Sequence, residues 1–363
     1  MNNHIPLQKI AVSAYRIPTE SPESDGTLAW DSTTLVLVEA SAGGKTGIGY
    51  SYADRASAVL AKELLAPLLN GANALDVPGQ WLRMVAAIRN LGRPGIASMA
   101  IAAVDVALWD LKAKLLDLPL VSLLGAVRES VAIYGSGGFT SYSVERLQQQ
   151  LGGWAQQGIP RMKMKIGREP AQDVARVAAA REAIGDSQLF VDANGAYCRK
   201  QALAMAEAFA NYGVVWFEEP VSSDDLDGLR LLRDRAPAGM EVSAGEYGYA
   251  LPYFERMLAH GAVDVLQADA TRCAGITGFL SVGPLCQARS MPMSSHCAPG
   301  IHLHPCCALP PLRHMEYFFD HVRIENMLFD GVVQPSVGEL RPDLSRPGLG
   351  LEFRHADARP YAI

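Results

Sequence analysis

The sequence has no excess of basic residues and few charges of either sign. Only 19% of its 363 residues are charged, and 38 acidic residues outnumber 32 basic ones, for a net charge of −6. A mildly acidic chain lacks the positive surface that binds a polyanion, so we expect no nucleic-acid partner. Hydrophobic residues make up 49% of the chain, which excludes wholesale disorder and is ample for a large core.

Long apolar runs are also missing. The longest stretch without Asp, Glu, Lys or Arg is Ser290–Leu312, and it contains three histidines and five prolines, so it does not predict a membrane span. The first residues, MNNHIPLQKI, have neither the basic nor the apolar part of a signal peptide. We therefore expect no association with a membrane.

No two cysteines have the C-x-x-C spacing, so we expect no zinc site built on cysteines. We interpret the thiols as reduced and mostly buried, in a cytoplasmic protein. All six lie in the second half of the chain: Cys198, Cys273, Cys286, Cys297, Cys306 and Cys307.

The N-terminal third has an α+β pattern. Residues 7–16, 32–40 and 45–52 are rich in strand-forming side chains, and the sequence Ser41-Ala42-Gly43-Gly44 predicts a hairpin between the last two runs. The polar segment Pro18–Asp31, with two prolines and a glycine, predicts a mobile loop. Apolar residues at positions 104, 108, 111 and 115 then predict one buried helix face.

After about residue 130, short apolar runs alternate with amphipathic helical patterns, which predicts a parallel sheet. About eight runs at this pitch favour a closed barrel. The short, proline-rich connection from His296 to Glu316 predicts that one barrel helix is missing or reduced. The runs are Val131–Gly135, Arg161–Ile166, Gln188–Ala193, Val214–Glu219, Glu241–Gly245, Val263–Ala268, Met291–Ser295 and Arg313–Tyr317.

Chemically capable side chains recur at or just past the ends of these runs, 20 to 28 residues apart. In a parallel barrel all strands end on one face, where barrel enzymes carry out their chemistry, so we expect these side chains to converge on one mouth. They are Lys165, Asp192, Glu218, Glu246, Asp269, His296 and Glu316.

Three of these side chains, Asp192, Glu218 and Glu246, are carboxylates from successive strands. Three converging carboxylates repel one another unless a cation holds them, and oxygen ligands from single residues suit Mg²⁺. The period of two along a strand places Asn194 on the face of Asp192. It does not decide which face points inward at the next strand, so Glu219 stays open as an alternative ligand to Glu218.

The remaining polar side chains are suited to proton transfer. Lys163 and Lys165 share one face of a strand, and we expect each ammonium group to lower the pKa of the other, so that one lysine can act as a base. Asp269 and His296 end adjacent strands, and a carboxylate behind an imidazole fixes its tautomer and orientation. We interpret them as a dyad.

Eight stretches form an ordered set of motifs: AIAAVDVALWDLKAKLLDLPLVSLLG (100–125), MKMKIG (162–167), VDANGAY (191–197), WFEEPV (216–221), SAGE (243–246), ADATRCAGIT (268–277), SSHCAPG (294–300) and HMEYF (314–318). In this order, and over nearly the whole chain, they resemble the enolase superfamily, and within it the mandelate racemase subgroup.

The resemblance implies a fold of three parts. We expect an α+β capping domain at residues 1–128, with lid loops at about 18–31 and 50–54. A modified (β/α)₇β barrel of the TIM type follows at 129–320, and the segment 321–363 packs back on the cap. We also expect a homo-oligomer, between a dimer and an octamer.

The resemblance also implies a role for each site residue. Asp192, Glu218 and Glu246 resemble the ligands of Mg²⁺. Lys165 resembles the base on one face of the substrate, and His296, paired with Asp269, the acid or base on the other. Lys163 resembles the group that polarises the substrate carboxylate, and Glu316 the group that hydrogen-bonds it. Asn194 resembles a group that assists near the enolate.

Such a site removes the weakly acidic proton next to a carboxylate and stabilises the enediolate that forms. The lid segments offer Trp30, Tyr50 and Tyr52 among many hydroxyls and carboxylates, which favours a polyhydroxy acid. We therefore expect an acid-sugar dehydratase that gives a 2-keto-3-deoxy acid. A racemase or epimerase of a 2-hydroxy acid and a sugar-acid cycloisomerase are the alternatives within the family. A Schiff-base barrel enzyme and a non-catalytic binding protein are the alternatives outside it.

Overall fold

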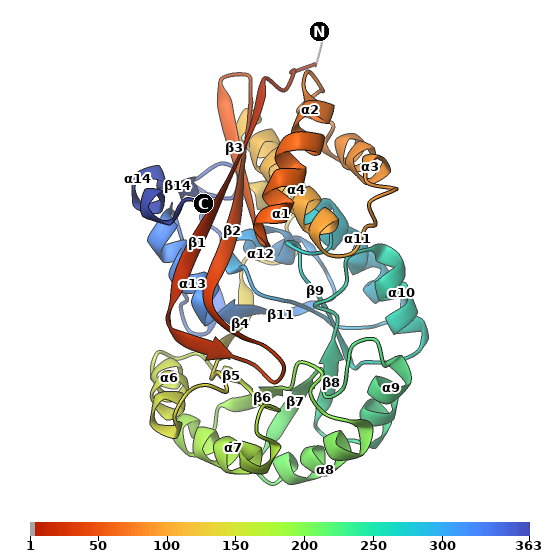
Figure 1. Ribbon diagram of the computed structural model, residues 1–363, viewed down its shortest axis with the longest axis vertical. Helices are drawn as coiled ribbons and strands as arrows, with labels where there is room; N and C mark the ends of the chain where they lie inside the picture. Colours follow the sequence, from red (N-terminus) through yellow and green to blue (C-terminus); the bar gives the residue numbers. More distant parts are fainter. Residues whose placement is uncertain (1–3) are drawn as a thin grey trace.

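The structure is a computed structural model that describes residues 4–363, so residues 1–3 of the predicted cap lie outside the described residues. Figure 1 shows a barrel with a part made of antiparallel strands and helices above it. No helix in the described part of the chain combines the length and the apolar character needed to cross a membrane.

Three antiparallel strands form the cap sheet in the order β1 (Lys9–Ser24), β2 (Ala29–Ala42) and β3 (Lys45–Tyr52). Ala42 pairs with Lys45, so Gly43 and Gly44 form a two-residue turn, and both have the positive φ that such a turn requires. The predicted hairpin is confirmed.

The prediction of a loop over Pro18–Asp31 is wrong except at residues 25–28. β1 and β2 continue as a long ribbon whose last pairs are Glu23 with Trp30 and Ser24 with Ala29, after a register shift. β1 is an edge strand, so its prolines need not donate a hydrogen bond to a neighbour. Figure 1 shows this ribbon descending from the cap to the barrel.

The long helix α4 (Ile96–Leu115) packs against the cap sheet at very short range. A Cβ atom at Gly47 of β3 would lie 2.3 Å from the backbone nitrogen of Leu111, and one at Gly49 would lie 2.3 Å from the carbonyl oxygen of Ala103. Only glycine allows this approach, which explains two glycines in a buried strand. The other cap helices are α1 (Arg55–Leu60), the π-helical η1 (Ala61–Leu65), α2 (Ala66–Leu69), α3 (Val77–Ala87) and α5 (Leu120–Leu124).

Eight parallel strands, β4 to β11, form the barrel, and β11 pairs back with β4 to close it. One helix joins each strand to the next, which confirms the (β/α)₇β fold (Figure 1). The strands are β4 (Val131–Gly137), β5 (Arg161–Lys165), β6 (Gln188–Asp192), β7 (Val214–Glu218), β8 (Glu241–Ala244), β9 (Val265–Ala268), β10 (Met293–Ser295) and β11 (Leu312–Phe318). The first six connecting helices are α6 (Val144–Gln156), α7 (Pro170–Ile184), α8 (Arg199–Ala210), α9 (Leu226–Arg235), α10 (Leu251–Ala259) and α11 (Gly275–Ala288).

The prediction of a missing or reduced helix before β11 is wrong. Helix α12 (Pro299–Ala308) has 10 residues, as many as α9. Pro299 lies in its first turn, where the backbone N–H has no partner within the helix in any case. Pro305 removes one hydrogen bond, but Cys306 and Cys307 are buried against the barrel core, and this burial offsets the loss.

The C-terminal segment contacts both the cap and the barrel. The rings of Phe353 and Tyr15 lie 5.3 Å apart, and Ile363 donates a backbone hydrogen bond to Ala14 of β1. Glu339 pairs with Ala132 of the barrel strand β4. The elements are α13 (Phe319–Leu328), β12 (Phe329–Asp330), β13 (Glu339–Leu340), β14 (Glu352–Phe353), α14 (His355–Ala358) and the 3₁₀ helix η2 (Arg359–Tyr361).

Candidate active site

Strand register brings the predicted side chains to one level of the barrel. Lys165 of β5 pairs with Asp192 of β6, which pairs with Glu218 of β7. Below them, Phe190 and Trp216 belong to an apolar cluster inside the barrel. The mouth is therefore a layer of charged side chains on an aromatic floor.

Asp192, Glu218 and Glu246 are all buried, and each offers a carboxylate oxygen within 4.8 Å of the other two. These oxygens are the ligand type that Mg²⁺ prefers. One oxygen of Glu246, Oε2, is buried without a hydrogen-bond partner, so it is free to bind a cation. The donor set therefore fits a divalent cation. Glu219, the alternative ligand, lines a separate cavity of about 650 Å³ alongside the site.

The three carboxylates differ in their affinity for protons. Burial and the charge of Asp192 raise the pKa of Glu218 well above its usual value. Burial also opposes ionisation of Asp192, but Lys165 and Lys163 outweigh it and lower its pKa. Burial likewise opposes ionisation of Glu246, but the attraction of His296 and Arg272 outweighs this effect and lowers the pKa of Glu246. A cation is needed for all three to be charged together.

The expected lowering of the lysine pKa values is wrong for this arrangement. Burial opposes the charged form of Lys163, but Glu218 and Glu316 outweigh it and raise the pKa well above its usual value. Burial opposes the charged form of Lys165 too, but its ammonium donates to Asp192 over 2.6 Å, and this carboxylate raises its pKa as well. The attraction of the surrounding carboxylates thus outweighs the repulsion between the two ammonium groups.

His296 and Asp269 form the predicted dyad. Nδ1 of His296 lies 2.8 Å from Oδ2 of Asp269, and the backbone and hydroxyl of Thr271 both donate to the other oxygen of Asp269 over 2.7 Å. Burial opposes ionisation of Asp269, but the hydrogen bond with His296 outweighs it and lowers the pKa. A fixed carboxylate behind Nδ1 leaves Nε2 facing the mouth for proton transfer.

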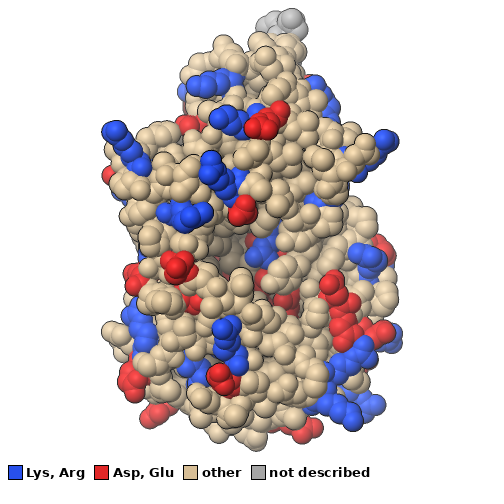
Figure 2. All heavy atoms as spheres, viewed as in Figure 1, with Lys and Arg blue, Asp and Glu red and all other residues tan. Residues whose placement is uncertain are grey.

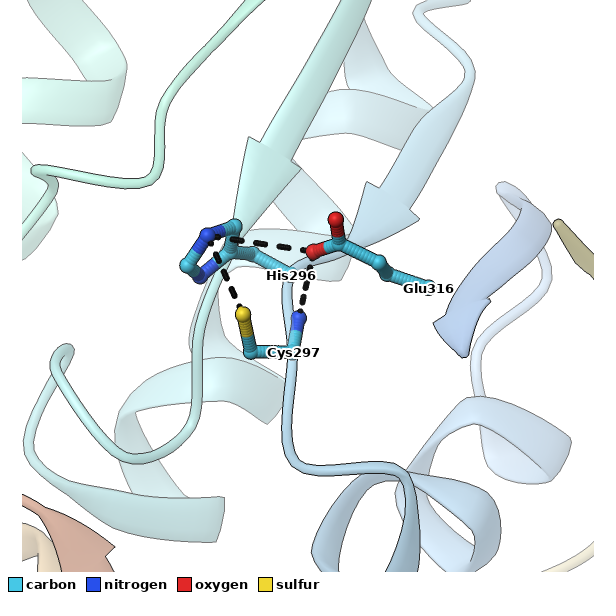
Figure 3. Close-up of side chains that lie close together, drawn as sticks. All are labelled: His296, Cys297 and Glu316. Atoms are coloured by element: carbon cyan, nitrogen blue, oxygen red, sulfur yellow. Dashed lines mark hydrogen bonds and ion pairs between the residues drawn. The ribbon is translucent and has the colours of Figure 1, made fainter. Parts of the chain in front are cut away.

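Glu316 and Asn194 also lie at the mouth. Glu316 accepts a hydrogen bond from the backbone N–H of Cys297 over 2.7 Å (Figure 3). Its other carboxylate oxygen lies 2.8 Å from the ammonium of Lys163. Asn194 has a left-handed backbone, and its buried Oδ1 has no hydrogen-bond partner within the described residues. That oxygen is available to a bound molecule.

A cavity of about 460 Å³ separates the mouth from the cap. Figure 2 shows the face of the molecule hollowed where cap and barrel meet. Lys165, Glu246 and His296 line it from the barrel, and Trp30 and Tyr52 line it from the cap, as predicted. The site therefore draws on both parts of the chain.

The prediction that Tyr50 belongs to the lid is wrong. Its side chain is fully buried in the core, and its hydroxyl donates to Glu325 over 2.6 Å. Tyr50 and Tyr52 point to the same face of β3, and their rings lie edge to face. Tyr52 is at the end of the strand and reaches the cavity, where it stacks on His321.

Sequence reasoning missed several residues that line the cavity, among them Arg272 and Cys297. Arg272 donates to Glu246 over 3.1 Å and lies 3.8 Å from Asp269. Its position three residues after Asp269, in the turn that follows β9, was the available signal. Cys297 directly follows His296, and its sulfur lies 3.3 Å from Nε2 of that histidine (Figure 3).

Known families match both parts of the chain. The sequence profile of the mandelate racemase/muconate lactonizing enzyme N-terminal domain matches residues 11–125, and that of the enolase C-terminal domain-like family matches residues 146–358. The chain belongs to the mandelate racemase group of the enolase superfamily. The matched ranges include the cap ribbon, the mouth residues and the His296–Asp269 dyad.

Three members of this superfamily show the range of similarity. A mandelate racemase/muconate lactonizing enzyme-like protein from Rubrobacter xylanophilus is 56% identical, with a TM-score of 0.97 over 99% of this chain and 100% of the other. L-talarate/galactarate dehydratase of Salmonella typhimurium is 31% identical over 95% of this chain and 88% of its own length. Its structure with Mg and L-lyxarohydroxamate has a TM-score of 0.91, at 29% identity over 99% and 93%. A racemase from Streptomyces coelicolor with bound magnesium is 30% identical, with a TM-score of 0.92 over 98% and 100%.

Proposed function

We propose that this protein is a Mg²⁺-dependent acid-sugar dehydratase that removes water from a polyhydroxy acid to give a 2-keto-3-deoxy acid. The observation that carries the proposal is one cavity that joins Lys165, the His296–Asp269 dyad and Glu246 to a cap wall of polar side chains, with Asp192 and Glu218 clustered around Glu246. The Salmonella relative, a dehydratase that binds Mg, supports it.

Asp192, Glu218 and Glu246 would hold the metal ion. Bound there, Mg²⁺ supplies positive charge to the substrate carboxylate as the proton on the neighbouring carbon leaves. Lys163, beneath the carboxylates and fully buried, adds a second positive charge for the developing enediolate. Asn194 offers its unpartnered side chain to the same region.

Lys165 and His296 do the proton transfer. One of them takes the α-proton, and the electron pair left on the α-carbon expels the 3-hydroxyl group as the other donates a proton to it. The enol that results becomes the 2-keto acid. Asp269 is a positioning residue, because it holds the imidazole tautomer through Nδ1.

The cap wall suits a hydroxylated substrate. Ser32, Thr34 and Tyr52 bring hydroxyl groups to the cavity, while Trp30 and Phe318 form its apolar sides. Hydroxyls of a sugar acid can exchange hydrogen bonds with these groups, whereas an aromatic acid would leave them unpaired.

The second candidate is a racemase or epimerase. Two proton-transfer groups on well-separated strands, Lys165 on β5 and His296 after β10, also serve to remove and return one proton on opposite faces. The Streptomyces racemase supports this reading. A Schiff-base mechanism is disfavoured, because carboxylates raise the pKa values of both lysines and hold them as ammonium ions.

Incubation of the enzyme with a library of acid sugars tests the proposal. We expect a 2-keto acid from at least one acid sugar, no product after treatment with EDTA, and recovery with Mg²⁺. Glu218→Gln is expected to lose activity by at least 10²-fold, with an unchanged circular dichroism spectrum. Exchange of the α-proton without a 2-keto product would favour the epimerase, and turnover after complete chelation would contradict both functions.

We further propose that the enzyme works in the cytoplasm as a homo-oligomer. All six cysteines are free thiols, which suits a reducing compartment, and five of them are buried. Light scattering of the purified protein measures the subunit count.

A further inference from the structure

Nε2 of His296 lies near one thiol sulfur and two carboxylate oxygens. It is 3.3 Å from the Cys297 sulfur and 3.8 Å from Oε2 of Glu316 (Figure 3). All three residues are buried, and the three atoms lie within 4.8 Å of one another. Oε2 of Glu246 is 3.4 Å from the same nitrogen and is buried without a hydrogen bond.

This donor set differs in chemistry from the carboxylate set. Nitrogen and sulfur ligands suit Zn²⁺ or Cd²⁺, whereas Mg²⁺ takes oxygen ligands. Around a tetrahedral zinc ion, with bonds of about 2.1 Å to nitrogen or oxygen and about 2.3 Å to sulfur, neighbouring ligand atoms are about 3.4–3.6 Å apart. The Cys297 sulfur, Oε2 of Glu246 and Oε2 of Glu316 lie 3.3, 3.4 and 3.8 Å from Nε2 of His296, respectively.

The surroundings hold these ligands in place. Asp269 accepts from Nδ1 of His296, which leaves the lone pair of Nε2 directed at the group, as in zinc sites where a carboxylate orients a histidine. The backbone N–H of Cys297 donates to the same oxygen of Glu316 that would bind the metal ion. Residue 297 has a positive φ of 52°, so its side chain leaves the backbone in an uncommon direction.

We propose that His296, Cys297 and Glu316 form a second metal site, selective for Zn²⁺ and Cd²⁺ over Mg²⁺, with Glu246 or water as the fourth ligand. A metal ion there occupies the lone pair of His296. It therefore inhibits the enzyme, a consequence that rests on the proposed function, whereas binding itself does not.

Cadmium binding to Mg²⁺-saturated protein tests the site directly. The parent variant is Cys198→Ser, which removes the exposed thiol, and the test variant adds Cys297→Ser. We expect the parent to gain the ultraviolet absorption of a cadmium–thiolate bond, saturating at one equivalent, and the test variant to lose that absorption. The same absorption in both variants would overturn the proposal, because another thiol would then be the ligand.

Calorimetry with Zn²⁺ provides a second measurement, in the presence of saturating Mg²⁺. We expect Cys297→Ser and His296→Asn each to weaken zinc binding at least tenfold. Zinc affinity equal to that of the parent in both variants would mean that the ion binds the carboxylate set, and would overturn the proposal. If Cys297→Ser does not fold, as judged by circular dichroism, His296→Asn decides, since it keeps the thiol.

Inhibition links the site to the reaction. At saturating Mg²⁺, we expect Zn²⁺ to inhibit the parent at a concentration at least tenfold lower than the concentration that inhibits the variant with Cys297→Ser. Equal inhibition of the two would overturn the link between the thiol and inhibition. Failure to find any substrate would contradict the proposed function alone, because the absorption and calorimetry experiments do not need one.

Discussion

At the residue scale, the charge on Lys165 depends on what Asp192 binds. The ammonium donates to this carboxylate, which also belongs to the set that fits Mg²⁺. A cation on Asp192 weakens the attraction that raises the lysine pKa, and Lys163 nearby then lowers it. Lys165 is an ammonium ion when the carboxylates hold no cation, and it can thus become a base when a cation is bound to them.

The two proton-transfer groups should act on different substrate hydrogens. In D₂O, His296→Asn is expected to lose turnover but still exchange the α-hydrogen that faces Lys165. Lys165→Ala should lose that exchange and keep exchange of the opposite epimer, each loss being roughly 10²–10⁴-fold. Asp269→Asn should slow only the His296 side. Wild-type exchange of both epimers in Lys165→Ala, measured by NMR, would show that Lys165 is not a base.

Buried Glu325, the partner of Tyr50, predicts a loss of stability as pH rises. Burial raises its pKa from 4.5 to about 7. The folded state therefore binds a proton that the unfolded state has released, so the contribution of Glu325 is complete below pH 4.5 and falls by about 3 kcal/mol as pH rises through 7. Urea unfolding between pH 5 and pH 8 measures this fall, and Glu325→Gln should make it smaller; burial also raises the pKa values of Asp105, to about 7, and of Glu23, to about 8, so part of the fall remains. An equally steep fall in Glu325→Gln would assign the effect to another group.

At the element scale, the β1–β2 ribbon reaches from the cap to the barrel, where its tip packs tightly. The backbone N–H of Thr140 donates to Ser24, and the hydroxyl of Ser141 donates to Pro22. A Cβ atom at Gly26 would lie 2.3 Å from the carbonyl oxygen of Ala193. The ribbon thus covers the mouth by direct contact with the ends of the barrel strands.

Gly26→Ala should displace this tip without unfolding the protein. Since the tip covers the cavity, we expect KM to rise and kcat/KM to fall about tenfold, with little change in Tm. Gly153→Ala, which adds a methyl group to α6 in open space, is the matched control; it should leave KM and kcat/KM unchanged and raise Tm slightly, because alanine favours a helix. A large fall in Tm in Gly26→Ala but not in Gly153→Ala would mean that the tip holds the cap and the barrel together rather than acting as a lid.

The same elements show what could be predicted from sequence. The strand ends predict that Lys165 and Asp192 lie at the mouth, because all strands of a parallel barrel end on one face. A period of two adds Lys163 to the face of Lys165, because side-chain direction along a strand is fixed by the backbone. Arg272 and Cys297 lie in turns after strands, where no period fixes direction. The ribbon at Pro18–Asp31 looked like a loop because prolines and polar residues are tolerated at a sheet edge as well as in loops.

At the scale of the whole molecule, the two walls of the cavity differ in charge. On the barrel wall, the charges of Lys165 and Arg272 are balanced by those of Glu246 and Asp269, and a metal ion held by the carboxylate set would add positive charge there, whereas Asp25 and Asp54 make the cap wall negative. A substrate carboxylate is therefore attracted at the mouth, and a second carboxylate at the far end of the substrate would face negative charge. Sugar hydroxyl groups, by contrast, can donate to those aspartates.

The charge difference predicts, on the basis of the proposed function, a preference for sugar acids with one carboxylate. For a matched pair such as galactonate and galactarate, we expect kcat/KM to favour the monoacid at least tenfold, provided that this configuration is accepted. Asp54→Asn keeps an oxygen for the N-cap of α1 and should reduce the preference severalfold. Asp31→Asn removes an exposed cap charge that does not line the cavity, and should leave the preference unchanged. Because Asp54 is exposed, added salt should also reduce the preference of the wild type. Equal or faster turnover of the diacid at low salt would show that the charge of the cap wall does not select the substrate.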